Sequence, residues 1–342
     1  MKNKTLLSIA IYSLLILLSL GTTYVNFLAH RSSLVQTFMT NDLNMADASD
    51  DVLALLESDF NSDLPNLSYT AIPIKALMSR YYTAKGDYSK ALSLLDESIA
   101  ENPYLKFSES EKAEVYDILG VKDSFKYYSK ESFYGLPKNQ RHWIQFSKAS
   151  VIDNDTLALD EGFELIKDET NTFFRLAYLS TNFSIGRDSD HVKQIALESK
   201  NIFNQDEEIR LSADYIIYGK VNVDSAIVLS KNAEKFFGSG IYDRSSKNYI
   251  LASELNPGDH THFENAGVSL LREKKYSESL KYLQYVKDSL NPKTGKSEYL
   301  MASIYEIQGK LKEACDLLDQ SAEFNFALAF QARVNACLGL KD

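Results

Sequence analysis

The sequence predicts an all-α protein, in which a solenoid of helix-turn-helix repeats follows one N-terminal apolar helix. Three observations carry this expectation. Only 14 glycines and 6 prolines occur in 342 residues, and long stretches are rich in Leu, Ala, Lys and Glu, which favours helix. The prolines recur at a period near that of helical repeats, and the first 30 residues contain a long uncharged run. Few alternating β-branched runs lie between turn residues, so strands are not expected.

Residues 1–30 are predicted to cross a membrane. Lys2 and Lys4 precede a run from Thr5 to His30 that has no Asp, Glu, Lys or Arg. About 20 apolar residues are enough to span the hydrocarbon core, and basic residues before the span hold the N-terminus in the cytoplasm. We therefore expect a single-pass protein of the cytoplasmic (inner) membrane, with the rest of the chain outside the cytoplasm.

The same segment has a second interpretation, as a cleaved signal peptide. Ser19-Leu20-Gly21 could serve as a small-x-small cleavage site. The apolar character continues through Tyr24, Val25, Phe27 and Leu28, which favours an uncleaved signal anchor. Cleavage would instead give a secreted or periplasmic protein. No cysteine follows the apolar run, so a lipoprotein is excluded.

Residues 31–66 are interpreted as an acidic linker with a short helix. No basic residue lies between Arg31 and Lys75. A solvated connector is the ordinary explanation of such a charge run, and a tail that binds cations or a partner is the alternative. The net charge of the whole chain is −10, which speaks against a nucleic-acid partner. The acidic residues of this segment are Asp42, Asp47, Asp50, Asp51, Glu57, Asp59 and Asp63.

The spacing of prolines marks a repeat in the remaining segment, residues 67–342. Pro103 and Pro137 are 34 residues apart, and Pro257 and Pro292 are 35 apart; each follows an amphipathic run. A period near 34 is typical of paired helices that bury their apolar faces against neighbouring pairs.

The stretch that starts at Ile72 resembles a tetratricopeptide repeat (TPR). In that family, small residues let helices A and B approach, a glycine ends helix A in a left-handed cap, and a proline stops helix B. With Pro103 at position 32 of the repeat, only Lys75 at position 4 departs from the family pattern. The matching residues are Met78, Ser79, Tyr82, Gly86, Tyr88, Ala91, Leu95 and Ser98, at positions 7, 8, 11, 15, 17, 20, 24 and 27.

Further copies follow with the same period. Clear copies start at Ala226, His260 and Gly295, and degenerate ones at Lys106, Gln140 and near Thr172. The segment 206–225 is predicted to be one long helix outside the register, and the final stretch FALAFQARVNACLGL a helix that closes the last repeat. The resemblance thus implies a TPR-like solenoid (an α-α superhelix) of about seven or eight repeats, some degenerate.

The resemblance also implies a function. TPR solenoids bind proteins or peptides on a concave face lined by helix A, and they scaffold complexes. The residues of this chain at the matching positions are Arg80, Glu264, Arg272, Lys296, Tyr299 and Glu306. We therefore expect a membrane-anchored extracytoplasmic scaffold, in envelope, secretion or surface-polysaccharide assembly. A glycan-binding protein or helical-repeat enzyme, and a structural subunit of a membrane complex, are the alternatives.

Motifs for catalysis and metal binding are not visible. No Ser-His-Asp order, phosphate loop or HExxH occurs, and we predict no enzyme activity, no cofactor and no metal site. His260 and His262 lie in DHTH, which we interpret as a helix start capped by Asp259 or Thr261. Cys315 and Cys337 are expected to be buried free thiols; a disulfide between neighbouring helices is the alternative in an oxidising compartment.

Overall fold

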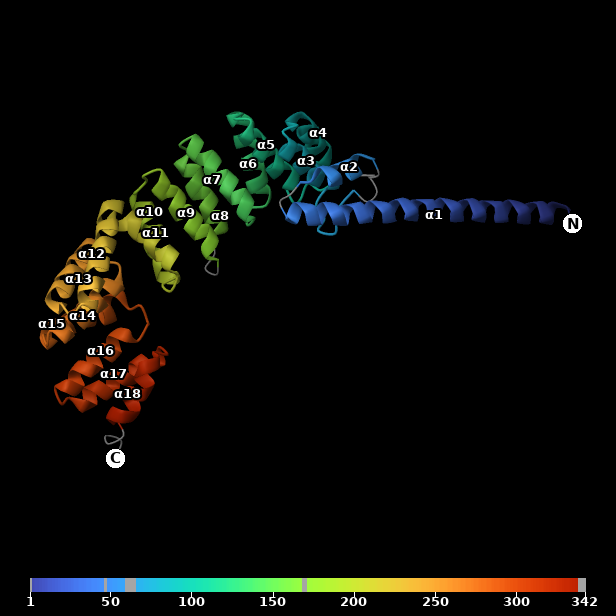
Figure 1. Ribbon diagram of the computed structural model, residues 1–342. Helices are drawn as coiled ribbons and strands as arrows, with labels where there is room; N and C mark the ends of the chain where they lie inside the picture. The colour runs from blue at the N-terminus through green and yellow to red at the C-terminus, as the bar shows by residue number, and fades with distance from the viewer. Residues whose placement is uncertain (1, 46–47, 59–65, 168–170, 338–342) are drawn as a thin grey trace. The chain divides into compact units, whose positions relative to one another are not determined.

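The computed structural model describes residues 2–45, 48–58, 66–167 and 171–337 (Figure 1). Across these ranges the regular elements are eighteen α-helices and one π-helical turn, and a single isolated bridge joins Leu67 to Pro73. The chain divides into two compact units, Met1–Lys167 and Asp168–Asp342. The prediction of an all-α, TPR-like fold preceded by one long apolar helix is confirmed.

The first unit holds α1 and α2 followed by three pairs of helices. Within each pair, the helices pack side by side in antiparallel fashion. The helices are α1 (Lys2–Asn44), α2 (Asp50–Ser58), α3 (Ile74–Lys85), α4 (Tyr88–Ser98), α5 (Phe107–Ile118), α6 (Lys122–Gly135), α7 (Gln140–Ile152) and α8 (Thr156–Ile166).

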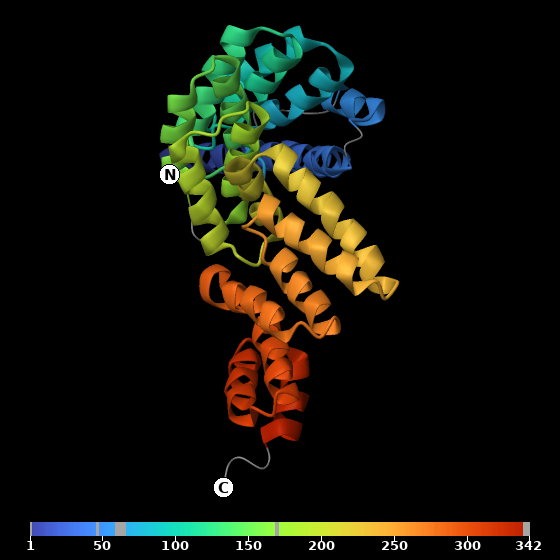
Figure 2. The same cartoon turned by 90° about the vertical axis from the view of Figure 1, so that its left-hand side faces the viewer.

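The second unit holds four further pairs, one additional helix and a closing helix. Figure 2 shows α12 and α13, in yellow and orange, lying side by side. Its elements are α9 (Thr172–Ser184), α10 (Asp190–Ile202), α11 (Glu207–Tyr218), α12 (Lys220–Gly238), α13 (Tyr242–Leu255), α14 (His260–Arg272), α15 (Tyr276–Tyr285), the π-helical turn η1 (Val286–Leu290), α16 (Lys296–Ile307), α17 (Leu311–Glu323) and α18 (Ala327–Cys337).

Helix α1 has two parts with different surroundings. Its apolar part is exposed; Leu17, for example, has 66% of its surface accessible. The stretch Ile9–Asn44 is long and apolar enough to cross a membrane. Beyond the apolar run, Ser32, Val35 and Met39 are buried. Their spacing of three and four residues places them on one face of the helix.

This buried face of α1 packs on the first repeat. Met39 and Leu56 of α2 belong to one apolar cluster with Ile74 and Tyr81, and the Tyr81 hydroxyl donates a hydrogen bond to the Met39 carbonyl at 3.2 Å. The segment 31–66 thus contains helix α1 up to Asn44 as well as the short helix α2. The structure shows helix here because apolar residues at helical spacing lie among the acidic ones.

The acidic side chains of this segment lie around the packed face. Asp50 and Asp51 occupy the first turn of α2, where the negative charge of a carboxylate interacts favourably with the positive end of the helix dipole. Glu57 accepts a hydrogen bond from the Tyr82 hydroxyl at 2.8 Å, and burial together with this carboxylate raises the pKa of Tyr82 to about 12. Asp47, Asp59 and Asp63 lie outside the described residues, and the domain boundaries stay predictions.

Each A–B hairpin closes with the same turn. One residue of the turn after helix A has a positive φ. The backbone N–H of the following residue donates a hydrogen bond to the carbonyl five residues before it, as from Asp87 to Tyr82 at 2.9 Å. This is the Schellman arrangement, which satisfies the carbonyls at a helix end. Glycine holds the position in five hairpins and Asn or Lys in two; the seven residues are Gly86, Gly120, Asn154, Gly186, Gly240, Lys274 and Gly309.

The segment 206–225 is not one long helix, so this prediction was wrong. Helix α11 ends at Tyr218, and α12 starts at Lys220 and continues to Gly238. Gly219 between them has φ +84° and ψ 146°, a conformation that ends helical geometry and that glycine adopts without steric cost. Helix α11 packs on α9 and α10 and is therefore an addition between two repeats.

The residues expected to pack between helices are buried. Ala91, Leu95 and Ser98 have no accessible surface. Gly267 fills a position that the pattern reserves for small residues, and a Cβ there would lie 2.8 Å from Leu283. The repeat pattern therefore reflects close helix approach, as the family resemblance implied.

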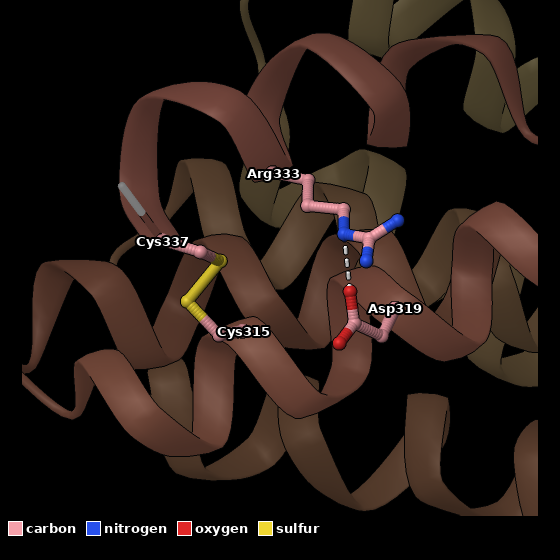
Figure 3. Close-up of a disulfide and its surroundings, with 4 residues drawn as sticks. All are labelled: Cys315, Asp319, Arg333 and Cys337. Atoms are coloured by element: carbon pink, nitrogen blue, oxygen red, sulfur yellow. Dashed lines mark ion pairs between the residues drawn. A yellow bond between two sulfur atoms is a disulfide. The ribbon is translucent and has the colours of Figure 1, made fainter. Parts of the chain in front are cut away.

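The last repeat is closed by α18 through a disulfide (Figure 3). Cys315 of α17 and Cys337 of α18 are bonded, with 5.7 Å between their Cα atoms. Arg333 of α18 and Asp319 of α17 form an ion pair between the same two helices. The expectation of two free thiols is corrected: α18 folds back on α17 and brings Cys337 within bonding distance of Cys315.

The turn geometry makes a stability prediction. Gly240→Ala places a side chain at φ +76°, which costs about 1 kcal/mol in unfolding free energy. Gly238→Ala, two residues earlier, is the matched control, since Gly238 lies at the end of α12 with no positive φ and open space around its Cβ direction. Thermal unfolding of the full chain in detergent, followed by circular dichroism, should show a lower midpoint for Gly240→Ala alone. Equal midpoints for the two variants would contradict the turn assignment.

Candidate functional site

The first helices of neighbouring pairs contact one another and carry paired polar residues across the contact. We call these first helices helix A. In the first unit they are α3, α5 and α7; in the second, α14 and α16 form one such contact. The polar residues on these faces are the candidates for binding a partner.

Glu111 of α5 is the centre of the contact in the first unit. It is 5% exposed, and its Oε1 accepts hydrogen bonds from Arg80 Nε at 3.0 Å and Nη2 at 2.6 Å. Arg141 of α7 binds the same oxygen from the other side and also pairs with Glu114. One buried carboxylate thus joins three successive A helices through two guanidinium groups, which are well suited to such contacts.

Further polar contacts continue along the same helices. The hydroxyl of Ser110 donates to Gln145 Oε1 at 2.8 Å, and Lys148 Nζ donates to Asp117 at 2.5 Å. We call this set the helix-A ladder of the first unit; its members are Arg80, Ser110, Glu111, Glu114, Asp117, Arg141, Gln145 and Lys148. A cavity of about 460 Å³ beside it is lined in part by Arg80, Glu111 and Arg141.

In the second unit, Glu264 and Lys296 are brought together. Glu264 on α14 is 2% exposed, and its Oε2 lies 3.2 Å from Lys296 Nζ on α16. Ser297 donates a hydrogen bond to Glu264 Oε1 at 3.1 Å, and Lys296 also donates to Asn265. Glu264 therefore joins two repeats, while the lysine is half-buried at the edge of the contact.

The other predicted groove residues lie in different settings. Arg272 is exposed at the end of α14. Tyr299 is half-buried, with its ring centroid 5.2 Å from that of Phe326, and Glu306 is half-buried further along α16. Arg80 lies in the first unit and the remaining five in the second. Their role as a groove stays a prediction.

Of the helix-A ladder, only Arg80 was among the residues predicted from the sequence. Glu114, Arg141 and Lys148 occupy groove positions of the degenerate copies that start at Lys106 and Gln140. The sequence does contain a pattern that could have indicated these contacts: opposite charges about 30 residues apart, such as Glu111 and Arg141. One repeat period separates residues that lie on neighbouring A helices, so such charges can meet.

The DHTH stretch is a helix start, as predicted. The Asp259 carboxylate accepts a hydrogen bond from the Thr261 backbone N–H at 2.9 Å and caps α14. Burial lowers the pKa of both His260 and His262, so the neutral imidazoles are favoured. Where side chains are described, no group of three or more His, Cys, Asp or Glu is arranged to hold a metal ion.

Comparison with known proteins finds similarity in structure alone. No family model and no curated protein matches the sequence. Three similar solved structures are a TPR protein from Parabacteroides merdae (13% identity, 76% of this chain and 96% of that one, TM-score 0.35), the P58(IPK) TPR domain (12%, 88% and 96%, 0.39) and yeast Tom70 (15%, 93% and 81%, 0.30). These likenesses are distant, and the TPR-like assignment rests on the hairpins and packing positions of the chain itself.

The helix-A ladder predicts different costs for two glutamates that bind the same arginine. Glu111→Gln leaves Arg80 and Arg141 without their shared buried anion and should lower the unfolding free energy by about 3 kcal/mol. Glu114→Gln removes a carboxylate whose side chain is 48% exposed and should cost about 0.5 kcal/mol or less. Urea unfolding of both full-length variants in detergent compares them; equal losses would exclude a central role for Glu111.

Proposed function

We propose that this protein is a membrane-tethered scaffold that binds protein or peptide partners outside the cytoplasm through its helix-A faces. The observation that carries the proposal is the construction of α1, whose exposed apolar part is continuous with a part that packs on the first repeat. Exposed apolar side chains along a helix of this length are more stable in the hydrocarbon core of a membrane than in water.

The disulfide supports the location outside the cytoplasm. Disulfides persist in oxidising compartments and are rare in the cytosol. The bond between Cys315 and Cys337 lies in the unit that basic Lys2 and Lys4 would direct across the membrane.

The partner-binding role is supported by the chemistry of the helix-A faces. Alternating cations and anions at the edges of the ladder, such as Lys148 and Glu114, remain partly exposed while Glu111 is buried. A partner with charges of both signs, presented as a helix or an extended peptide, would pair with these side chains. An envelope, secretion or surface-polysaccharide process is the setting we favour.

The location can be tested by thiol labelling. Full-length protein recovered from cell membranes should react with maleimide at neither cysteine until a reductant is added, because Cys315 and Cys337 are bonded. A matched form without residues 2–30, kept in the cytosol, should show reactive thiols after denaturation. Thiols that react directly in the denatured membrane form would contradict an oxidising location. A soluble product that starts near Thr22 would instead support the cleaved form.

The partner-binding face can be tested by site-specific crosslinking in intact cells. A photoreactive residue in place of Lys148 or Arg272 should yield discrete crosslinked proteins, because both lie exposed on A helices. The control is Lys122, an exposed lysine at the start of the second helix of a pair. Crosslinks of equal yield at Lys122, or none at the A helices, would contradict the assignment.

A further inference from the structure

A basic cavity lies in the second unit where the repeat pattern is interrupted. It has a volume of about 370 Å³, within the range of small-molecule sites. Helices α10, α11 and α14 and the loop after η1 contribute to its wall. The lining residues are Leu197, Lys200, Asn201, Asn204, Arg210, Tyr218, Gly258, His260, Ser289, Leu290, Asn291, Pro292 and Lys293.

Two irregular features build this cavity. The additional helix α11 supplies Arg210 and Tyr218. The π-helical turn Val286–Leu290 is followed by Asn291, which caps it in the left-handed conformation. The Pro292 carbonyl accepts a hydrogen bond from Gln205 Nε2 at 2.8 Å. The loop is thereby tied to the turn before α11, which holds Lys293 in the wall. π-helical turns of this kind are often found at functional sites.

The charge of the lining is opposite to that of the chain. The protein has 47 acidic residues and 37 basic ones, yet the cavity is lined by two lysines, one arginine and no carboxylate. Two acids beside the lining have partners of their own. Asp214 is bound by Lys200 and by Asn256 Nδ2 at 3.1 Å. Asp259 caps α14 and also lies within electrostatic range of Arg210. Of the three lining cations, Lys200 is thus paired with Asp214, and Arg210 and Lys293 are the candidates for binding an anion.

The remaining polar lining suits hydroxyl groups. Three asparagine side chains, Asn201, Asn204 and Asn291, each offer both a hydrogen-bond donor and an acceptor. A ligand that carries an anion together with several hydroxyls would use both kinds of lining.

An aromatic cavity adjoins the basic one. It has a volume of about 480 Å³, and Phe263, Tyr282 and Tyr285 line it together with Lys281, Gln284 and Asp288. The one carboxylate in this lining, Asp288, accepts a hydrogen bond from Gln284 Nε2 at 2.6 Å and lies 3.7 Å from Lys287 Nζ. The rings of Phe263 and Tyr285 have centroids 4.8 Å apart. Ser289 of the π-helical turn belongs to both walls, so the two cavities meet at this turn. Aromatic rings offer an apolar surface against which the C–H face of a sugar ring can pack.

We propose that the two adjoining cavities form a binding site for an anionic sugar, with a phosphate or carboxylate group between Arg210 and Lys293. The asparagine amides bind its hydroxyls, and the sugar ring or its neighbour packs over Phe263 and Tyr285. This site shares helix α14 with the Glu264–Lys296 contact but uses other side chains of that helix, and its test requires no protein partner.

Calorimetric titration of the full chain in detergent tests the site with defined probes. Glucose 1-phosphate tests a sugar that carries a phosphate, and glucuronate tests one that carries a carboxylate. Glucose and inorganic phosphate serve as controls for the sugar alone and the anion alone. We expect saturable binding of at least one anionic sugar, at least tenfold tighter than glucose or phosphate alone. Binding should weaken as salt is raised. Absence of binding by both anionic sugars, or equal binding of inorganic phosphate, overturns the proposal.

Variants locate the binding. The double variant Arg210→Gln with Lys293→Gln should weaken binding of the anionic sugar at least tenfold, while Lys247→Gln, at an exposed lysine of α13 outside both cavities, should leave it unchanged. Tyr285→Ala should weaken binding of the sugar severalfold, and circular dichroism should show that this variant is still folded, since Tyr285 is 41% exposed. Binding that the double variant retains in full overturns the proposed site.

Discussion

The structure depends on one constraint, which is that a helical pair can bury its apolar face only against a neighbouring pair. The two ends of the array therefore need elements of another kind to cover them. At the N-terminal end, Met39 of α1 and Leu56 of α2 complete the cluster of the first pair. At the C-terminal end, Ala329 and Cys337 of α18 complete the cluster of the last. The helix that we propose as membrane anchor is thus also the cover of the first repeat.

Polar contacts between A helices complement this apolar packing. Glu111 and Glu264 are almost inaccessible carboxylates, and each is bound by cations or hydroxyls from the next helix A. Such contacts fix how one pair lies on the next, because a buried charge is stable only with its partners in place. The side chains at the edge of these contacts, Lys148 among them, remain available to solvent. The same rows of residues therefore hold the repeats together at their centre, and we propose that they bind partners at their rim.

The sequence allows prediction of features that recur and gives little information on those that occur once. Gly86 and Gly240 could be predicted because the same turn requires a left-handed residue in every hairpin. The helix break at Gly219 could not be predicted in this way, because it occurs once and interrupts the repeat period. The bond between Cys315 and Cys337 depends on how α18 folds back, which periodicity does not specify. The cavity around Arg210 was missed for the same reason, because its residues come from the irregular elements α11 and η1.

The two roles that we propose for α1 bear on how the first repeat would lie relative to the membrane. At about 1.5 Å per residue, the stretch from Leu28, near the end of the uncharged run, to Met39 rises by roughly 16 Å. No break in the helix separates these residues, so the packed part begins within a few turns of the apolar part. A flexible linker would let the repeats sample a wide volume, whereas a continuous helix would hold the first repeat near the membrane surface in the anchored arrangement that we propose. Cleavage near Gly21 would leave Val35 and Met39 in place, so the cover of the first repeat would survive the loss of the anchor. In the proposed arrangement, folding of the repeats and attachment to the membrane share one helix but use different segments of it.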